Sequence, residues 1–237
     1  MSLSLRLTSV LLICLLLIAI ALPAAASPKD YPDSAIALMD IKFKCNCSRT
    51  GAGVMVGRRG LLTAGHNLIC ATHGKGASTI RFRFGVKAAN DCLLSVSSGW
   101  TYWYYTDFTD SSGKVSYDSK WDIGYVRFDK NVGDTTGWYG TMAPSDHDLS
   151  WEYFHLTSYA GTSICYEYST VDPIDSYRFT FNRMSTSIYE GAPIFVQDEG
   201  SYPTVLGIYT SHSSDKSYAR RLTNQIIADM RSDGVVE

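Results

Sequence analysis

Short runs of aliphatic, β-branched and aromatic residues recur along most of this 237-residue chain, with Gly, Asp, Asn and Ser between them. Runs of this kind favour extended strands, and many short strands joined by turns are typical of a β-sandwich or a β-barrel. The sequence therefore predicts an all-β fold. The predicted strands cover residues 34–43, 53–56, 61–64, 79–84, 124–128, 154–158, 163–168, 176–181, 192–196 and 205–210.

One helix is predicted near the C-terminal end, where Thr223 can cap a turn that places Ile226, Ile227 and Met230 on one apolar stripe. A second distinctive segment is the aromatic run Trp-Thr-Tyr-Trp-Tyr-Tyr at 100–105. It could form a platform for a sugar or a peptide. We favour a strand with aromatic side chains packed on both faces, because aromatic residues are common in strands.

The first 26 residues are predicted to be a secretory signal peptide. Residues 11–22 are almost wholly apolar, Arg6 is the only charge before them, and three alanines ending at Ala26 form an A-x-A cleavage site. A membrane anchor is disfavoured because the apolar run is short and no basic flank follows it. We therefore expect a secreted, extracellular protein that is not membrane-bound after cleavage. Cys14 would be discarded, and a propeptide beyond Ala26 is left open.

The charge balance gives no sign of a nucleic-acid partner. Cleavage after residue 26 leaves 211 residues with 20 Lys and Arg against 23 Asp and Glu, a formal charge of −3, because Arg6 is the only charge lost. A chain of this balance is not expected to seek phosphates or an anionic membrane surface. Its length suits one large β-domain or two small barrels. We expect a monomer.

Five cysteines remain after cleavage: Cys45, Cys47, Cys70, Cys92 and Cys165. Secretion favours disulfides, and the odd number leaves at least one thiol unpaired within the chain. Cys45 and Cys47 are expected on one strand face, where they cannot easily pair with each other. Cys92 and Cys165 are interpreted as small buried apolar residues. His66 and His73 lie near the Cys-x-Cys pair, but this spacing matches no common zinc pattern, so we expect no metal and no cofactor.

Three motifs occur in a characteristic order. Leu-Leu-Thr-Ala-Gly-His ends at residue 66, Trp-Asp-Ile-Gly-Tyr-Val covers 121–126, and Tyr-Glu-Gly-Ala-Pro-Ile-Phe covers 189–195. This order resembles the chymotrypsin-like serine proteases, most closely their bacterial glutamyl-endopeptidase branch. The likeness continues through Asn-Val-Gly-Asp-Thr-Thr-Gly-Trp-Tyr-Gly at 131–140 and Gly-Ile-Tyr-Thr at 207–210. It covers nearly all of the chain beyond the predicted signal peptide.

The resemblance implies two antiparallel six-stranded β-barrels and a C-terminal helix. The first barrel would cover residues 27–132 and the second, with the helix, 151–237. A linker that contains several Gly and Asp residues and Pro144 would occupy 133–150. Many chymotrypsin-like proteases also have a disulfide that ties the strand before the histidine loop to the segment after it. In this chain Cys70 could form such a bridge with Cys45 or Cys47.

The resemblance also assigns three catalytic positions. His66 falls at the general base and Asp122 at the carboxylate that orients it, with Asp118 as the fallback. The position of the nucleophilic serine holds Glu190. A carboxylate has no proton for His66 to remove at neutral pH, and its acyl adduct would be a labile anhydride. We therefore predict an inactive homologue, or pseudoprotease, that binds a peptide or protein between its barrels.

Further family positions are altered. Ile188 stands where the family has a glycine, in an oxyanion-hole region formed with Tyr189, and a β-branched side chain resists the unusual backbone of such loops. Loss of one oxyanion donor costs about 100- to 1000-fold in rate. Tyr209 replaces the family's histidine in Gly-Ile-His-Thr, so Tyr209 and His212 are candidates for a substrate pocket. Cleavage after glutamate cannot be assumed.

Three alternatives remain open for the site. Ser187 could act as a displaced nucleophile in an active endopeptidase, although its hydroxyl would lie several ångströms from the usual place. His66, Asp122 and Glu190 could bind a divalent cation in a metal-dependent hydrolase. Glu190 could instead form an ion pair with protonated His66 and raise its pKa. We expect the ion pair, because it requires no further component.

Overall fold

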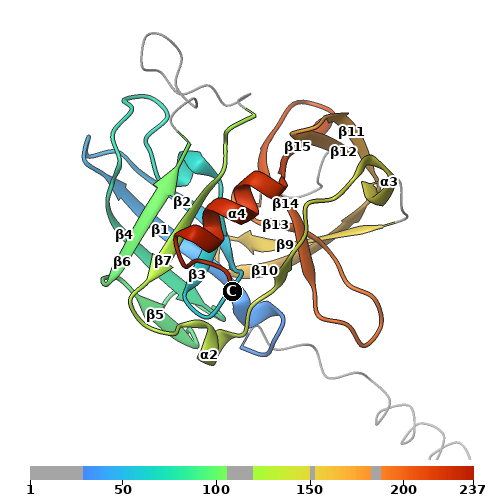
Figure 1. The fold of residues 1–237 in the computed structure, drawn as a ribbon. Coiled ribbons are helices and arrows are strands. Elements are labelled where there is room, and N and C mark those ends of the chain that lie inside the picture. The colour runs from blue at the N-terminus through green and yellow to red at the C-terminus, as the bar shows by residue number, and fades with distance from the viewer. Residues whose placement is uncertain (1–28, 106–119, 150–152, 183–187) are drawn as a thin grey trace, which may run out of the picture.

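The computed structural model describes residues 29–105, 120–149, 153–182 and 188–237. Three sequence-based predictions lie outside these residues: the signal peptide at 1–26, the fallback carboxylate Asp118 and the displaced nucleophile Ser187. Two curled β-sheets stand side by side (Figure 1). Among the described residues, no helix combines the length and the apolar character that a membrane span requires.

The first sheet has seven antiparallel strands in the order β5-β4-β1-β2-β3-β7-β6. Its interior is filled by aromatic and aliphatic side chains, among which Phe82 and Phe128 meet edge to face with ring centroids 5.0 Å apart. The strands are β1 (Ile36–Phe43), β2 (Ser48–Met55), β3 (Gly60–Thr63), β4 (Ala77–Phe84), β5 (Leu94–Val96), β6 (Trp100–Tyr104) and β7 (Gly124–Phe128). Two 3-10 turns, η1 (Asp33–Ala35) and η2 (Gly65–Asn67), flank this sheet's strands in the chain.

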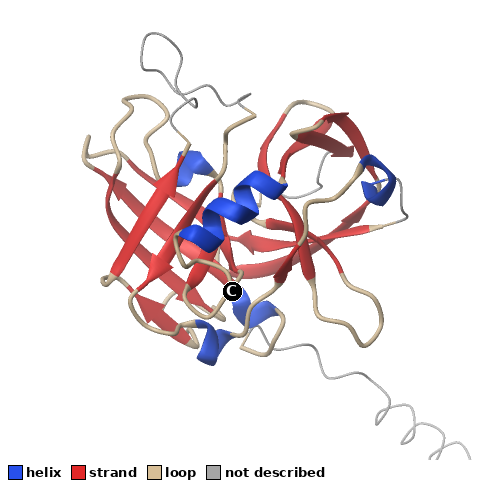
Figure 2. Cartoon of the chain, in the orientation of Figure 1, coloured by secondary structure: helices blue, strands red, loops and turns tan. Residues whose placement is uncertain are grey.

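The second sheet runs in the order β10-β9-β13-β14-β15-β12-β11. The two-residue strand β8 pairs in parallel with the first two residues of β14, Thr204 and Val205. Its own core contains Phe179, Leu206 and Ile194. The strands are β8 (Gly140–Thr141), β9 (Phe154–Ala160), β10 (Ser163–Ser169), β11 (Val171–Asp175), β12 (Arg178–Asn182), β13 (Pro193–Val196), β14 (Thr204–His212) and β15 (Lys216–Arg221). Strands make up most of the molecule, and one longer helix crosses in front of them (Figure 2).

The prediction of an all-β, two-barrel fold with a C-terminal helix is confirmed. The sheets contain seven and eight strands rather than six each, because short strands extend them. β5 has only three residues and β8 only two, too few to show a sequence pattern. The segment predicted as a linker, 133–150, contains β8 together with α2 (Gly133–Thr136) and α3 (Asp146–Leu149). The proposed domain boundaries themselves stay a prediction.

The aromatic run forms β6, as predicted for a strand. Trp100, Tyr102, Trp103 and Tyr104 are all partly buried against the first core. Trp103 stacks on Tyr125 of the neighbouring strand β7, with 5.6 Å between ring centroids. These contacts occupy the rings in packing between strands, so nothing about β6 calls for a sugar or peptide ligand.

The C-terminal helix α4 (Asn224–Ser232) begins at Thr223, whose hydroxyl accepts a hydrogen bond from Ile226 N–H at 3.3 Å. Its apolar stripe is buried, as predicted. This stripe joins the core of the first sheet although the helix follows the last strand of the second. Tyr125 of β7 donates a hydrogen bond of 2.7 Å to Asp233, just beyond the helix. The end of the chain thus returns to the first barrel (Figure 1).

Candidate functional site

His66 and Asp122 form a buried pair, as their sequence motifs predict. His66 Nδ1 lies 2.7 Å from Asp122 Oδ2, and the backbone N–H of His66 donates to Asp122 Oδ1 at 3.0 Å. Both side chains are almost completely inaccessible to solvent. Because the carboxylate accepts from both the ring and the backbone of one residue, it fixes the orientation of the imidazole.

Local geometry explains how the two residues meet. β3 ends at Thr63, and the chain turns through η2, which carries His66. A Cβ atom at Gly65 would lie 3.2 Å from the backbone of Ile123, so glycine allows η2 to approach the start of β7 closely. Asp122 sits in a tight turn closed by a 2.7 Å hydrogen bond from Ile123 N–H to Trp121 C=O.

Glu190 comes from the second barrel and reaches the other side of the same imidazole. Its Oε2 lies 3.2 Å from His66 Nε2. The Glu190 carbonyl accepts hydrogen bonds from Ala52 N–H at 2.8 Å and from Asn67 Nδ2 at 2.9 Å. Gly191 has φ of +95°, and a Cβ there would lie 2.1 Å from the carbonyl oxygen of Ala52. Only glycine therefore fits after Glu190, which docks the loop onto the first barrel.

Arg49 of β2 supplies a second cation to Glu190. Its Nη2 lies 2.6 Å from Glu190 Oε2, and the two side chains are 24% and 25% exposed. Arg49, Glu190, His66 and Asp122 thus form a continuous chain of alternating charge when His66 is protonated. Glu190 and His66 lie at ion-pair distance, as predicted, and Arg49 stabilises the ionised form of Glu190, because opposite charges within 4 Å favour each other's ionised form.

The pKa values follow from this arrangement. Burial and the charge of Arg49 act to lower the pKa of His66, but Asp122 and Glu190 outweigh them, and the pKa is raised above 6.5. Burial alone would raise the pKa of Glu190. The hydrogen bond and charge of His66, together with Arg49, instead lower it from 4.5 to about 2. The site therefore favours an imidazolium between two carboxylates.

These shifts predict a pH window of maximal stability. Glu190 contributes stability above pH 4.5 that is lost as the pH falls towards 2, and His66 contributes stability below pH 6.5 that is lost as the pH rises through its folded pKa. Glu190→Gln should lower the pKa of His66 and abolish the loss of stability between pH 4.5 and 2, which is about 3 kcal/mol for such a shift. The checks are an NMR titration of His66 and urea unfolding across this range; an unchanged His66 pKa would contradict the ion pair.

The predicted oxyanion-hole region is engaged in other contacts. The side chain of Ile188 is buried in the core of the second barrel. Tyr189 N–H donates to the carbonyl oxygen of Tyr159 at 3.1 Å, and Tyr189 C=O accepts from Ser158 Oγ at 3.0 Å. These two backbone bonds fix the residue before Glu190 against β9.

The two pocket candidates lie together on β14. The hydroxyl of Tyr209 is 2.9 Å from His212 Nδ1. The Tyr209 side chain is 2% exposed and belongs to the core of the second barrel, whereas His212 is exposed at the strand's end. Tyr209 N–H and C=O also hold the loop after Glu190, through Ala192 C=O and Gly191 N–H. The backbone of Tyr209 thus positions the loop that carries Glu190.

Sequence reasoning missed Arg49 and Asn67. Asn67 follows His66 directly in the sequence, so its position could have marked it as a site residue; in the structure it is fully buried. Arg49 offered none, because its contact with Glu190 joins residues 141 positions apart and nothing around it in the sequence marks a buried partner. The general rule that a buried carboxylate needs a cation predicts that a partner exists, but it does not say which one.

Comparison with known proteins places the fold. No protein-family model matches the sequence. The structure is similar to that of a Glu endopeptidase in complex with MPD, with a TM-score of 0.71 and 14% identity over 89% of this chain and 95% of that one. It is also similar to the protease Anisep from Arthrobacter nicotinovorans, with a TM-score of 0.65 and 16% identity over 86% and 97% of the two chains. The fold is that of the chymotrypsin-like serine proteases, and these neighbours include a glutamyl endopeptidase.

One curated relative is similar in sequence. The extracellular metalloprotease of Bacillus subtilis (strain 168) is 24% identical over 215 residues, which is 87% of this chain and 65% of that protein. The chain thus spans less than two thirds of that relative's length.

Proposed function

We propose that this protein is a secreted chymotrypsin-like serine protease homologue without proteolytic activity, which acts by binding a peptide or protein at the junction of its two barrels. The observation that carries this proposal is that His66 and Arg49 together hold the Glu190 carboxylate, an arrangement that we call the clamp on Glu190. The residue at the nucleophile position is a carboxylate held between His66 Nε2 at 3.2 Å and Arg49 Nη2 at 2.6 Å.

The clamp acts against catalysis in two ways. A general base needs an unprotonated nitrogen facing the nucleophile, and here Nε2 faces a carboxylate that favours the protonated ring. A nucleophile also needs to be released for attack, and the charge-assisted bonds to Arg49 and His66 stabilise the carboxylate where it is. The low pKa of Glu190 expresses that stabilisation.

Binding is supported by the exposure of the same pair. About a quarter of each side chain, Arg49 and Glu190, is accessible at the junction of the barrels. A ligand with a carboxylate or an ammonium group could exchange partners with this pair without reaching buried Asp122. Adding candidate peptides while following the NMR signals of His66 tests this: a specific ligand should shift them, and a panel of peptides and protease inhibitors without effect would count against this junction as the binding site.

Absence of proteolysis is tested with a broad peptide library and a fluorophosphonate probe, beside His66→Ala and an active chymotrypsin-like protease as the positive control. We expect no cleavage and no covalent label in either version of this protein. Cleavage that disappears in His66→Ala and in Ser187→Ala would instead establish the displaced nucleophile and overturn the proposal.

A metal-dependent hydrolase is the second candidate, because the Bacillus subtilis relative carries the name metalloprotease. The geometry argues against a metal at His66. Asp122 and Glu190 face opposite nitrogens of its ring, so one ion cannot contact all three side chains. Arg49 already places a positive charge beside Glu190. Cleavage that a chelator abolishes and that ignores the fluorophosphonate probe would favour this candidate.

A further inference from the structure

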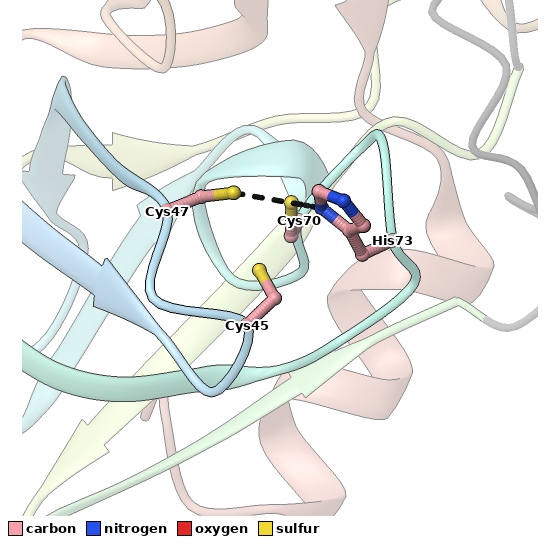
Figure 3. A group of neighbouring side chains, drawn as sticks. All are labelled: Cys45, Cys47, Cys70 and His73. Atoms are coloured by element: carbon pink, nitrogen blue, oxygen red, sulfur yellow. Dashed lines mark hydrogen bonds between the residues drawn. The ribbon is translucent and has the colours of Figure 1, made fainter.

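Three cysteines and a histidine, none of which belongs to the clamp on Glu190, gather beside the turn between β1 and β2 (Figure 3). The thiol sulfurs of Cys45, Cys47 and Cys70 and a ring nitrogen of His73 all lie within 4.8 Å of one another. His73 Nδ1 is 3.5 Å from Cys47 Sγ and 3.5 Å from Cys70 Sγ. In the part of the chain that the structure describes, all five cysteines, including these three, carry free thiols.

Two tight turns present these side chains. Cys45 and Cys47 lie in the turn between β1 and β2, not on a strand face as expected, because Asn46 adopts a φ of +66° there. Asn46 N–H donates to Phe43 C=O at 2.9 Å and closes the turn. The left-handed residue lets both flanking thiols lie near Cys70 (Figure 3).

The second turn follows η2. Gly74 N–H donates to Cys70 C=O at 2.8 Å, and Gly74 has a φ of +61°. A hydrogen bond of 3.0 Å from Lys44 N–H to Gly76 C=O joins this turn to the first. Backbone hydrogen bonds therefore hold the two turns together and place their side chains opposite each other.

We propose that Cys45, Cys47, Cys70 and His73 bind one Zn²⁺ ion in a tetrahedral site. Zinc bonds of about 2.3 Å to sulfur and 2.0–2.1 Å to nitrogen place ligand atoms ~3.6 Å apart for a sulfur and a nitrogen and ~3.8 Å apart for two sulfurs. The observed 3.5 Å separations from His73 Nδ1 match the first value. Soft thiolates with one imidazole are the ligands that zinc prefers, and four protein ligands leave no position open for substrate.

A disulfide within this cluster would involve fewer of its four side chains than a zinc ion would. A bond of about 2.0 Å between Cys70 and either Cys45 or Cys47 would use two of the three sulfurs and leave His73 without a role. Zinc uses all four side chains. Binding displaces the thiol protons, so three thiolates and one Zn²⁺ leave a net charge of −1 that is shared among the ligands. The bridge implied by the family resemblance is thus the competing outcome.

The site has a structural consequence. Zinc would tie the β1–β2 turn to the segment that begins four residues after His66. It would therefore stabilise the loop that carries His66 while taking no part in chemistry there. The expectation of no metal rested on the spacing of the Cys-x-Cys pair from His66 and His73, which matches no common zinc pattern. The structure instead engages His66 with Asp122 and Glu190 and brings His73 to the sulfurs.

The test is a titration of the purified protein, reduced with a non-thiol phosphine, with zinc chloride alone. We expect one zinc ion per chain after gel filtration, measured by elemental analysis. Cobalt(II) in its place should give the intense visible bands of a tetrahedral site and thiolate-to-cobalt charge transfer. A chelator should lower the unfolding temperature of the metal-bound protein, because a ligand that binds the folded state stabilises it.

Variants distinguish this site from adventitious binding. His73→Gln and Cys70→Ser should weaken zinc binding at least about tenfold, whereas Cys165→Ser should leave it unchanged. His73 is exposed, so its variant should fold even if the buried Cys70 does not tolerate change. Three results would overturn the proposal: no zinc retained by the reduced protein, equal retention by His73→Gln, or mass spectra of unreduced protein that show a Cys70 disulfide and no metal.

Discussion

Glu190→Ser alone should leave peptide hydrolysis close to background, whereas Glu190→Ser combined with Ile188→Gly should raise kcat/KM by about 100- to 1000-fold over the single variant. The serine restores a hydroxyl next to His66, which the Asp122 pair already orients. It does not restore the oxyanion hole. Ile188 anchors its loop in the core of the second barrel, and the amide of Tyr189 is bound to the Tyr159 carbonyl.

The measurement is steady-state hydrolysis of a peptide ester, and fluorophosphonate labelling counts the sites that are competent. Each variant is repeated with His66→Ala, which should abolish any gain. Strong hydrolysis by Glu190→Ser alone would show that Ile188 does not obstruct the oxyanion hole, and the inactivity of this protein would then rest on one residue.

Asp122→Ala should lower the free energy of unfolding by about 3–5 kcal/mol, the usual cost of removing one partner from a buried ion pair. The Asp122 carboxylate is 1% exposed and accepts from both the ring and the backbone of His66. Without it, Glu190 is the remaining carboxylate beside His66, and burial and the charge of Arg49 act to lower the His66 pKa.

The matched control is Asp134→Ala. Asp134 also pairs with a cation, Arg58 at 2.9 Å, but both side chains are nearly half exposed. Exposed pairs contribute little to stability, because solvent and salt screen the two charges. Urea unfolding between pH 4.5 and 6.5, where His66 and Glu190 are both charged, compares the two. If the two variants lose similar free energies of unfolding, burial is not what makes the Asp122–His66 pair stabilising.

The resemblance carried by the sequence motifs predicted the fold and the meeting of His66, Asp122 and Glu190. The motifs were insufficient for β15. This strand reads Lys-Ser-Tyr-Ala-Arg-Arg, which lacks the apolar character of a buried strand, yet Arg220 and Arg221 are buried. The Arg221 guanidinium bonds to the Pro144 carbonyl, and that of Arg220 donates to Tyr177 C=O at 2.7 Å. Partners distant in the chain make this burial possible.

The four proposed zinc ligands could not be predicted from the sequence either. Known zinc spacings describe ligands that one short segment brings together. In this chain the Cys-x-Cys pair depends on a left-handed Asn46, and its partners come from a turn 23 residues beyond Cys47. Only the pairing of backbone segments brings these residues into one cluster, and no spacing rule contains that information.

The return of the C-terminal segment to the first barrel has a consequence for how the molecule folds. Ile226, Met230 and Val235 fill the same core as strands β1 to β7, and the carbonyl of Val235 packs against Gly60 so closely that a Cβ there would lie 1.8 Å from it. A chain emerging from the ribosome cannot complete its first barrel until its last residues are available. The two halves must therefore mature together, and a truncation near residue 225 should expose the apolar interior of the half that was made first.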